Sequence, residues 1–203
     1  ESNLTLTGNK GVDSRKFTIK EYNYSHLMKW AEDSKLLVFT AHRRENFGRP
    51  IIEMFSAIKQ LIKKHKDLKV IFPVHLNPNI KKIAYKSFEN VERIKLIPPL
   101  NVVDFHNLIA NSHIILTDSG GIQEEATFLG IPTFVVRKFT ERKESLKSGN
   151  IKMLGTDYAE VVKSLNAILQ SDSNLDRMRK SSTIYGDGNA SKRITKIIGE
   201  FLK

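Results

Sequence analysis

The chain has 203 residues, of which 40% are hydrophobic and 27% charged, with a formal net charge of +11. This composition is that of a globular protein and argues against a disordered chain or a collagen-like repeat. No apolar run approaches the ~20 residues that span a bilayer, and the first residues do not resemble a signal peptide, so we expect no membrane association. The absence of cysteine excludes disulfides and thiolate metal sites and fits a reducing, cytoplasmic compartment.

The positive charge is spread along the chain rather than gathered in one segment. Lysines are scattered through helix-like stretches such as residues 59–69, and no basic segment is interleaved with aromatic residues. A basic protein first suggests nucleic-acid binding, because lysine and arginine release counterions from phosphate. The scattered pattern instead favours a solvated, lysine-rich surface, so we expect no nucleic-acid partner.

Short apolar runs alternate with longer amphipathic ones from residue 36 onward. The first 35 residues contain a polar lead-in and one helical stretch at 21–32. The predicted strands are 36–41, 70–74, 93–97, 113–117 and 132–136. The predicted helices are 51–65, 77–88, 101–112, 121–130, 158–169 and 189–202. Strands and helices that alternate with short connections predict a parallel sheet, in a Rossmann-like doubly wound α/β domain.

The segment after the predicted strand 113–117 is a candidate anion site, because open parallel sheets bind ligands where their strands end. Ser119, Gly120 and Gly121 turn the chain, and a helix is expected from about Ile122. Glycines allow a ligand to approach the backbone, and the free N–H groups of a helix start favour a phosphate. A glutamate about one turn further, at 124 or 125, could accept two hydroxyls of a ribose, as acidic residues do in dinucleotide-binding folds.

A simpler interpretation of the same segment is an ordinary capped helix, with Asp118 or Ser119 as the N-cap. Glu124 and Glu125 would then lie in the first turn, where carboxylates suit the positive end of the helix dipole. The segment lacks both the lysine of a Walker loop and the GxGxxG pattern. The segment therefore indicates a phosphate-binding site, but it does not indicate which reaction the protein catalyses.

Polar residues also crowd the segments that follow the first two predicted strands. His42, Arg43, Arg44, Glu45 and Asn46 come after strand 36–41. Histidine can move a proton near neutral pH, and arginine can clamp anionic oxygens, although a salt-bridged surface loop is the alternative. His75 ends strand 70–74, where a lone histidine is more often structural. Without a cluster of carboxylates or cysteines around them, His42 and His75 do not predict a metal site.

A fourth charged segment, residues 137–145, follows strand 132–136. It contains Arg137, Glu141, Arg142 and Glu144. One of these arginines could meet a diphosphate held at residues 119–120, because guanidinium groups bind phosphate oxygens in pairs. An exposed charged loop is the alternative.

Taken in order, these segments resemble the C-terminal half of UDP-N-acetylglucosamine 2-epimerases. The matching segments are TGN at 7–9, TAHRREN at 40–46, PVHLNPN at 73–79, LTDSGGIQEEA at 116–126, TER at 140–142, GTD at 155–157 and YGDGNAS at 185–191. The resemblance covers nearly the whole chain. HRREN and SGGIQEEA together are the most specific part of it.

The resemblance implies a GT-B architecture, in which two Rossmann-like domains hold a UDP-sugar in the cleft between them. It also implies interconversion of UDP-GlcNAc and UDP-ManNAc by elimination of UDP to 2-acetamidoglucal and re-addition, without a cofactor. Residues 1–35 would be the interdomain crossover segment and helix, 36–184 the UDP-binding domain, and 185–203 the C-terminal helix returning towards the N-terminal domain. The full-length protein would be a homodimer.

The resemblance further assigns the nucleotide contacts. It implies that the diphosphate lies on Ser119, Gly120 and Gly121, that Glu125 holds the ribose hydroxyls, and that uracil lies near the main chain around Phe105. These positions agree with the anion site inferred from the residues alone.

The remaining site residues are also implied by the resemblance. Arg142 would contact the diphosphate, Arg44 would contribute to substrate binding, and His42 would be a catalytic residue near the leaving group. Arg43 and His75 resemble residues that hold a second UDP-GlcNAc as an activator. The HRREN segment resembles the non-hydrolysing branch of the family.

Two departures from the family pattern affect these expectations. Lys143 stands where proline commonly follows TER. In addition, the family takes its proposed C2 carboxylates and a phosphate-binding arginine from the N-terminal domain. We therefore expect residues 1–203 alone to bind UDP weakly and not to epimerise, and the last helix to leave an apolar face uncovered. A UDP-sugar glycosyltransferase and a non-catalytic UDP-sugar-binding domain are the alternatives.

Overall fold

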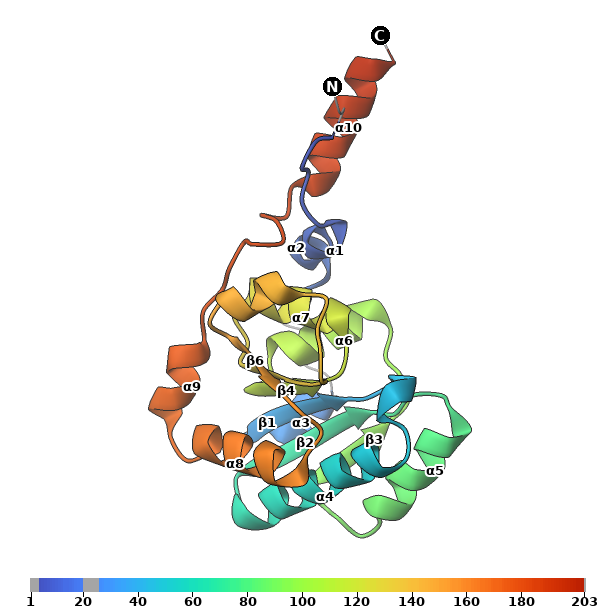
Figure 1. The fold of residues 1–203 in the computed structure, drawn as a ribbon, viewed down its shortest axis with the longest axis vertical. Helices are drawn as coiled ribbons and strands as arrows, with labels where there is room; N and C mark the ends of the chain where they lie inside the picture. The colour runs from blue at the N-terminus through green and yellow to red at the C-terminus, as the bar shows by residue number, and fades with distance from the viewer. Residues whose placement is uncertain (1–3, 20–25, 203) are drawn as a thin grey trace.

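A six-stranded parallel sheet forms the centre of the molecule in the computed structural model, which describes residues 4–19 and 26–202. The strand order is β3-β2-β1-β4-β5-β6 (Figure 1). The strands are β1 Lys35–Thr40, β2 Leu68–Pro73, β3 Ile94–Ile97, β4 Ile114–Thr117, β5 Thr133–Val136 and β6 Ile151–Leu154. Strands β1 and β4 are neighbours, with Thr40 level with Thr117. The order reverses between these two strands, so the predicted doubly wound sheet is confirmed.

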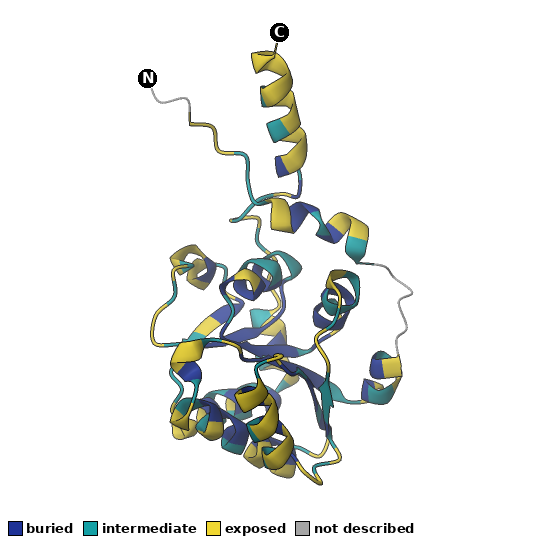
Figure 2. Cartoon of the chain, turned by 90° about the vertical axis from the view of Figure 1, so that its right-hand side faces the viewer, coloured by how far each residue is buried: buried dark blue, intermediate teal, exposed yellow. Residues whose placement is uncertain are grey.

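Helices cover both faces of the sheet (Figures 1 and 2). The α-helices are α1 Lys10–Asp13, α2 Arg15–Thr18, α3 His26–Ala31, α4 Arg49–Lys64, α5 Pro78–Ser87, α6 Val102–Ala110, α7 Gly120–Leu129, α8 Tyr158–Leu169, α9 Asp172–Met178 and α10 Ala190–Phe201. Short 3-10 helices occupy Arg44–Asn46 and Lys143–Lys147. Buried residues of α4, α5, α8 and α9 pack on one face of the sheet, and those of α3, α6 and α7 on the other.

The alternation of side chains along β1 supplies both of these cores. Leu37 and Phe39 pack towards α4, whereas Leu36 and Val38 pack towards α6 and α7. The Phe39 ring lies 4.6 Å from the Phe72 ring, centroid to centroid, and both are fully buried. A strand buried on both faces reads as an unbroken apolar run, which is why this strand was predictable from the sequence.

Several elements differ from the sequence prediction. Strand β6 was missed because its sequence IKML is short and carries the exposed Lys152. No helix was predicted at α9, which lies between the predicted helices 158–169 and 189–202, or at α1 and α2, which precede the predicted helix 21–32. Of the predicted helix 21–32, the structure shows α3, and residues 20–25 lie outside the described residues. Helix α7 begins at Gly120 rather than near Ile122.

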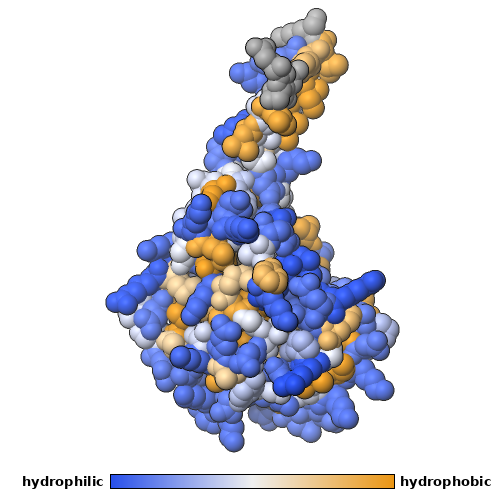
Figure 3. Space-filling view, viewed as in Figure 1, coloured by the Kyte–Doolittle hydropathy of each residue, from blue (hydrophilic) through white to orange (hydrophobic). Residues whose placement is uncertain are grey.

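Helix α10 projects from the rest of the domain (Figure 1). Its start is fixed by Asp13 of α1, whose carboxylate oxygens accept the N–H groups of Ala190 at 3.0 Å and Ser191 at 2.6 Å. Ala190 is buried, but Ile198, Phe201 and Leu202 are exposed. Figure 3 shows apolar side chains along one side of this projecting part. The uncovered apolar face expected for the last helix is therefore present.

Candidate functional site

Asp118 connects the loops that follow β1 and β4. Its side chain is fully buried, and its Oδ2 accepts the backbone N–H groups of His42 at 3.0 Å and Arg43 at 2.9 Å. Asn46 Nδ2 donates to the same oxygen at 3.0 Å. Burial on its own would raise the pKa of Asp118, but the hydrogen bonds from His42, Arg43 and Asn46 hold that pKa below its ordinary value. Asp118 is therefore an ionised anchor that shapes the loop after β1.

His42 is held by the same carboxylate through its ring. His42 Nδ1 lies 3.0 Å from Asp118 Oδ1, and the His42 side chain remains 41% exposed. A buried carboxylate on one ring nitrogen fixes the orientation of an imidazole. This partner of His42 was not predicted from the sequence, because Asp118 is 76 residues away along the chain. A polar residue at the end of a buried strand is the signal that could have indicated this role.

His75 lies beside His42, as the order of the strands requires. The two imidazole rings are stacked with their centroids 6.2 Å apart. The Nδ1 atom of the exposed His75 accepts the N–H of Asn77 at 3.2 Å. Within residues 4–19 and 26–202, no group of three or more His, Asp or Glu side chains gathers as metal ligands would.

The start of α7 lies next to the Arg43 side chain, and Gly120 itself is buried. Ser119 is the N-cap, with its Oγ accepting from the N–H of Ile122 at 3.5 Å, so Asp118 is not the capping residue. At Gly120, a Cβ atom would lie only 2.9 Å from Glu141 Oε1 and 3.7 Å from an Arg43 guanidinium nitrogen. The backbone here approaches charged side chains so closely that only glycine fits without a shift.

Charged side chains gather in front of Gly120. Glu141 accepts from Arg137 at 2.7 Å and from Arg43 at 3.2 Å, and Arg137 also meets Glu45 at 3.1 Å. The hydrogen bond from its own backbone N–H, together with Arg137, lowers the pKa of Glu141 to about 2. Guanidinium groups and a helix N-terminus thus surround one carboxylate, which is the environment an anionic ligand also favours.

Glu125 lies further along α7 and faces α2 and α6. Its Oε1 is 2.5 Å from Arg15 Nη2 and 3.8 Å from His106 Nε2. His106 adjoins Phe105, the residue expected near the uracil. Because α7 begins at Gly120, Glu124 and Glu125 lie beyond its first turn, and the expectation that they sit within it was wrong. Sequence analysis did not single out Arg15.

The other charged residues of the prediction lie at separate places. Arg142 pairs with Glu124, which also accepts from Asn9, so this arginine lies over α7 rather than in front of Gly120. Arg44 is exposed at the start of its 3-10 helix. The structure therefore brings His42, Arg43 and Gly120 close together, with the Arg142–Glu124 pair one turn further along α7.

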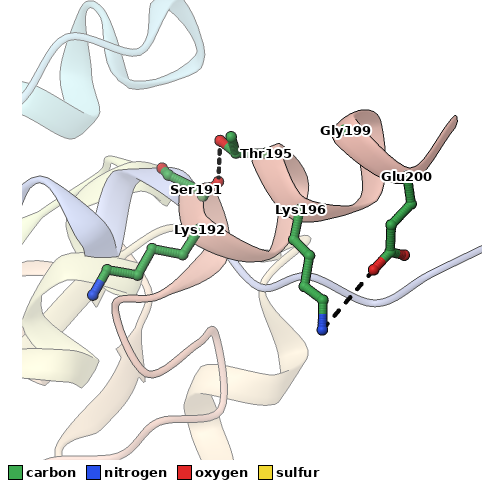
Figure 4. A pocket seen from close by; sticks show the side chains of 6 residues that line it. All are labelled: Ser191, Lys192, Thr195, Lys196, Gly199 and Glu200. Carbon is green, nitrogen blue, oxygen red and sulfur yellow. Dashed lines mark hydrogen bonds and ion pairs between the residues drawn. The ribbon is translucent and has the colours of Figure 1, made fainter. Parts of the chain in front are cut away.

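A hollow of about 670 Å³ runs along α10 (Figure 4). Its lining residues are Ser191, Lys192, Thr195, Lys196, Gly199 and Glu200. All six come from one helix, and Lys196 reaches Glu200 at 4.0 Å within it. This hollow shares no residue with the loops after β1 and β4. It is therefore part of the projecting surface and not of the candidate site.

His106 makes the stability of the domain sensitive to pH. Burial, assisted by the charge of Arg15, lowers the pKa of His106 from 6.5 to about 4. Between these values the unfolded chain binds more protons, so the contribution of the neutral ring is complete above pH 6.5 and is lost as the pH falls towards 4. Between pH 7 and pH 4, we expect the free energy of unfolding to fall by about 1–3 kcal/mol less in His106→Gln than in the unmodified chain.

Urea unfolding at pH 7 and pH 4.5 measures this difference. Replacement of the exposed His75 with glutamine is the matched control. An equal pH dependence in the His106→Gln variant and the unmodified chain would contradict the assignment.

The family model described as UDP-N-acetylglucosamine 2-epimerase matches residues 1–199. The chain belongs to this family. The UDP-N-acetylglucosamine 2-epimerase of Bacillus subtilis is 42% identical over 95% of this chain and 51% of its own length. A putative UDP-N-acetylglucosamine 2-epimerase of Thermotoga maritima is 40% identical over 96% of this chain and 53% of its own. This epimerase-family chain thus spans about half the length of these curated relatives.

Solved structures of the family have the same fold. The Staphylococcus aureus MnaA–UDP co-structure superposes with a TM-score of 0.93, at 41% identity, over 97% of this chain and 54% of that one. The Neisseria meningitidis UDP-GlcNAc 2-epimerase bound to UDP-GlcNAc gives a TM-score of 0.87, at 34% identity, over 96% of this chain and 55% of that one. The sheet is that of the Rossmann-like half of the GT-B architecture. None of the described helices is long and apolar enough to cross a membrane.

Proposed function

We propose that this epimerase-family chain is the UDP-binding half of an enzyme that interconverts UDP-GlcNAc and UDP-ManNAc. The observation that carries the proposal is the start of α7, where Ser119 caps the helix and the Gly120 backbone lies beside the Arg43 guanidinium. Free N–H groups at a helix start, next to a guanidinium, form a diphosphate site. The UDP and UDP-GlcNAc complexes of two relatives support this choice of ligand.

The proposed nucleotide site extends along α7. The diphosphate contacts Ser119, Gly120 and Gly121, the ribose hydroxyls reach Glu125, and uracil lies against the main chain at Phe105. The proximity of Glu125 to α6, through His106 at 3.8 Å, supports a continuous path from phosphate to ribose to base. Arg142, which pairs with Glu124 one turn beyond Gly120, and Arg44 are proposed as further substrate contacts.

The proposed reaction needs a good leaving group and a proton carrier. The bond from C1 to the UDP oxygen breaks as the proton leaves C2, which gives 2-acetamidoglucal and UDP. A proton then returns to the opposite face of C2, and UDP adds back to C1. His42 is the proposed catalytic residue of this half, since Asp118 orients its ring beside the proposed anion site, within reach of the departing oxygens.

The domain organisation proposed for this half follows the sequence expectation. Residues 36–184 form the UDP-binding domain, 1–35 the crossover segment, and 185–203 the segment that returns to the other domain. The exposed apolar face of α10 supports the last assignment.

We place the full-length enzyme in the cytoplasm, as a homodimer of the non-hydrolysing branch. Arg43, the next residue after His42, and His75, whose ring stacks on that of His42, are proposed to hold an activating second UDP-GlcNAc.

A chimaera tests the enzymatic proposal. The N-terminal half of the Bacillus subtilis relative, joined to residues 1–203, is expected to form UDP-ManNAc from UDP-GlcNAc without an acceptor. The isolated chain is expected to bind UDP but to show no turnover, because a single half supplies only part of the groups around C2. Product is followed by NMR of the anomeric proton.

Each outcome of that experiment decides between functions. An inactive chimaera, alongside an active relative and a UDP-binding chain, would favour a non-catalytic nucleotide-sugar-binding domain. Sugar transfer to an acceptor without epimerisation would favour a glycosyltransferase. Turnover by the isolated chain would contradict the proposed division of the active site between two halves.

A further inference from the structure

Arg15 is an almost completely buried arginine outside every motif that the sequence indicated. It lies on α2, with 2% of its side chain exposed, and its Nη2 is 2.5 Å from Glu125 Oε1. Its Nε approaches the carbonyl oxygen of Gly11 at 3.5 Å. A buried guanidinium is costly unless it is paired, so its pairing with the carboxylate proposed for the ribose is the main contact that retains it there.

Hydrogen bonds to α6 hold α2 next to the proposed nucleotide site. Thr18 Oγ1 lies 2.6 Å from His106 Nδ1, and Asn107 Nδ2 donates to the Thr18 carbonyl oxygen at 2.7 Å. Arg15 therefore reaches Glu125 from a helix that is itself attached to α6. This attachment sets the position of the guanidinium, and through it the position of the carboxylate.

Arg15 is also the cation that balances Glu125. Burial raises the pKa of the Glu125 carboxyl, the hydrogen bond and charge of Arg15 oppose that rise, and the charge of Glu124 adds to it. The third neighbour, His106, has a pKa lowered to about 4 and is neutral near pH 7. Removal of Arg15 would leave Glu125 buried beside a neutral ring and another carboxylate, which favours protonation.

Each side chain of the Arg15–Glu125 ion pair has one polar atom without a hydrogen bond in the described part of the chain. Arg15 Nη1 and Glu125 Oε2 are both buried, and neither has a hydrogen-bond partner in the described part of the chain. A hydroxyl group can satisfy such a pair, because it accepts from a nitrogen and donates to an oxygen at the same time. Ribose offers two adjacent hydroxyls.

We propose that Arg15 is a positioning residue for nucleotide recognition, which holds the Glu125 carboxylate charged and oriented for the 2′- and 3′-hydroxyls of a ribose. The proposal rests on the proposed UDP-binding function and adds to it a determinant of sugar specificity, located in the segment before the sheet. Replacement of Arg15 is therefore expected to abolish the preference of the chain for a ribose nucleotide over a deoxyribose nucleotide.

The test compares UDP with 2′-deoxy-UDP as ligands of the 203-residue chain, by NMR titration at pH 7.5. The unmodified chain is expected to prefer UDP by roughly tenfold or more, since a hydroxyl bound to a charged acceptor contributes that much. In Arg15→Met the preference is expected to fall below about threefold, mainly through weaker UDP binding. Lys16→Met, which removes an exposed cation from the same helix, is the matched control and keeps the preference.

A second pair of variants separates positioning from folding. Arg15→Gln keeps a hydrogen-bond donor without the charge, and it is expected to lose the preference while the melting curve still shows a cooperative fold. Glu125→Gln is expected to lose the preference by itself, so adding Arg15→Met should change it no further. If neither Arg15 variant folds, Arg15 is a structural residue and the proposal is wrong.

The same titrations distinguish a failure of the role proposed for Arg15 from a failure of the proposed UDP-binding function. A chain that binds UDP and keeps its ribose preference in Arg15→Met overturns the role of Arg15 alone. Tighter UDP binding by Arg15→Met also overturns it, since Arg15 would then compete with the ribose for Glu125. A chain that binds neither nucleotide overturns the UDP-binding function itself, and the role of Arg15 with it.

Discussion

Asp118→Ala is expected to lower the free energy of unfolding by about 3–5 kcal/mol at pH 7, because it removes a buried charge and leaves its donors without an acceptor. Those donors are the N–H groups of His42 and Arg43 and the amide of Asn46. Urea denaturation measures the loss. The pKa of Asp118 is held below its ordinary value of 3.8, so its stabilisation is complete above that pH and is lost as the pH falls further.

Asp157→Ala provides the matched control for this prediction. Asp157 is also an aspartate that accepts a backbone N–H, that of Glu160 at 3.0 Å, but it is exposed at the start of α8. Its loss should cost about 1 kcal/mol, the ordinary value of an N-cap. If Asp118→Ala costs no more than Asp157→Ala, the idea that Asp118 anchors the loop after β1 is wrong.

Gly120→Ala is expected to weaken UDP binding by about 10- to 100-fold, since it places a methyl group where the diphosphate meets the helix start. The added Cβ would lie 2.9 Å from Glu141 Oε1, at the flexible end of a side chain, so the domain should still fold. Titration of the chain with UDP, followed by NMR, gives the affinity. A melting temperature close to that of the unmodified chain would show that the loss belongs to the site.

The control for a general effect of alanine in a helix is Gly199→Ala. A Cβ at Gly199 of α10 would meet nothing within 4 Å. This variant should keep the UDP affinity and gain up to ~1 kcal/mol of helix stability. Unchanged UDP affinity in Gly120→Ala would contradict the proposed diphosphate position.

The strands that are buried on both faces could be predicted from the sequence. Residues 36–41 form an unbroken apolar run, and the observed β1 is Lys35–Thr40. The run around β6 is too short and too mixed to stand out, because Ile151 and Leu154 are buried while Lys152 is exposed. Such a strand is stabilised mainly by pairing with β5, which is a property of the fold and not of the local sequence.

The candidate site could be predicted only in part, for a related reason. The topology of a parallel sheet placed the loops after β1 and β4 at one edge, so His42, Ser119 and Gly120 could be selected from the sequence. Their contacts depend on strand register, and the hydrogen bonds between His42 and Asp118 join residues 76 positions apart. The pairing of Arg15 with Glu125 crosses a still longer separation in the chain. No periodicity or motif encodes such a contact.

Helix α10 has twelve residues, and its buried contact is confined to Ala190 at the first turn. A helix of this length is marginal in water when nothing covers its apolar side. The order of its later turns, around Ile198 and Phe201, therefore depends on whatever surface comes to cover them. Folding of these turns and assembly with that surface form a single thermodynamic event, so the strength of the assembly is reduced by the entropy lost when the helix becomes ordered.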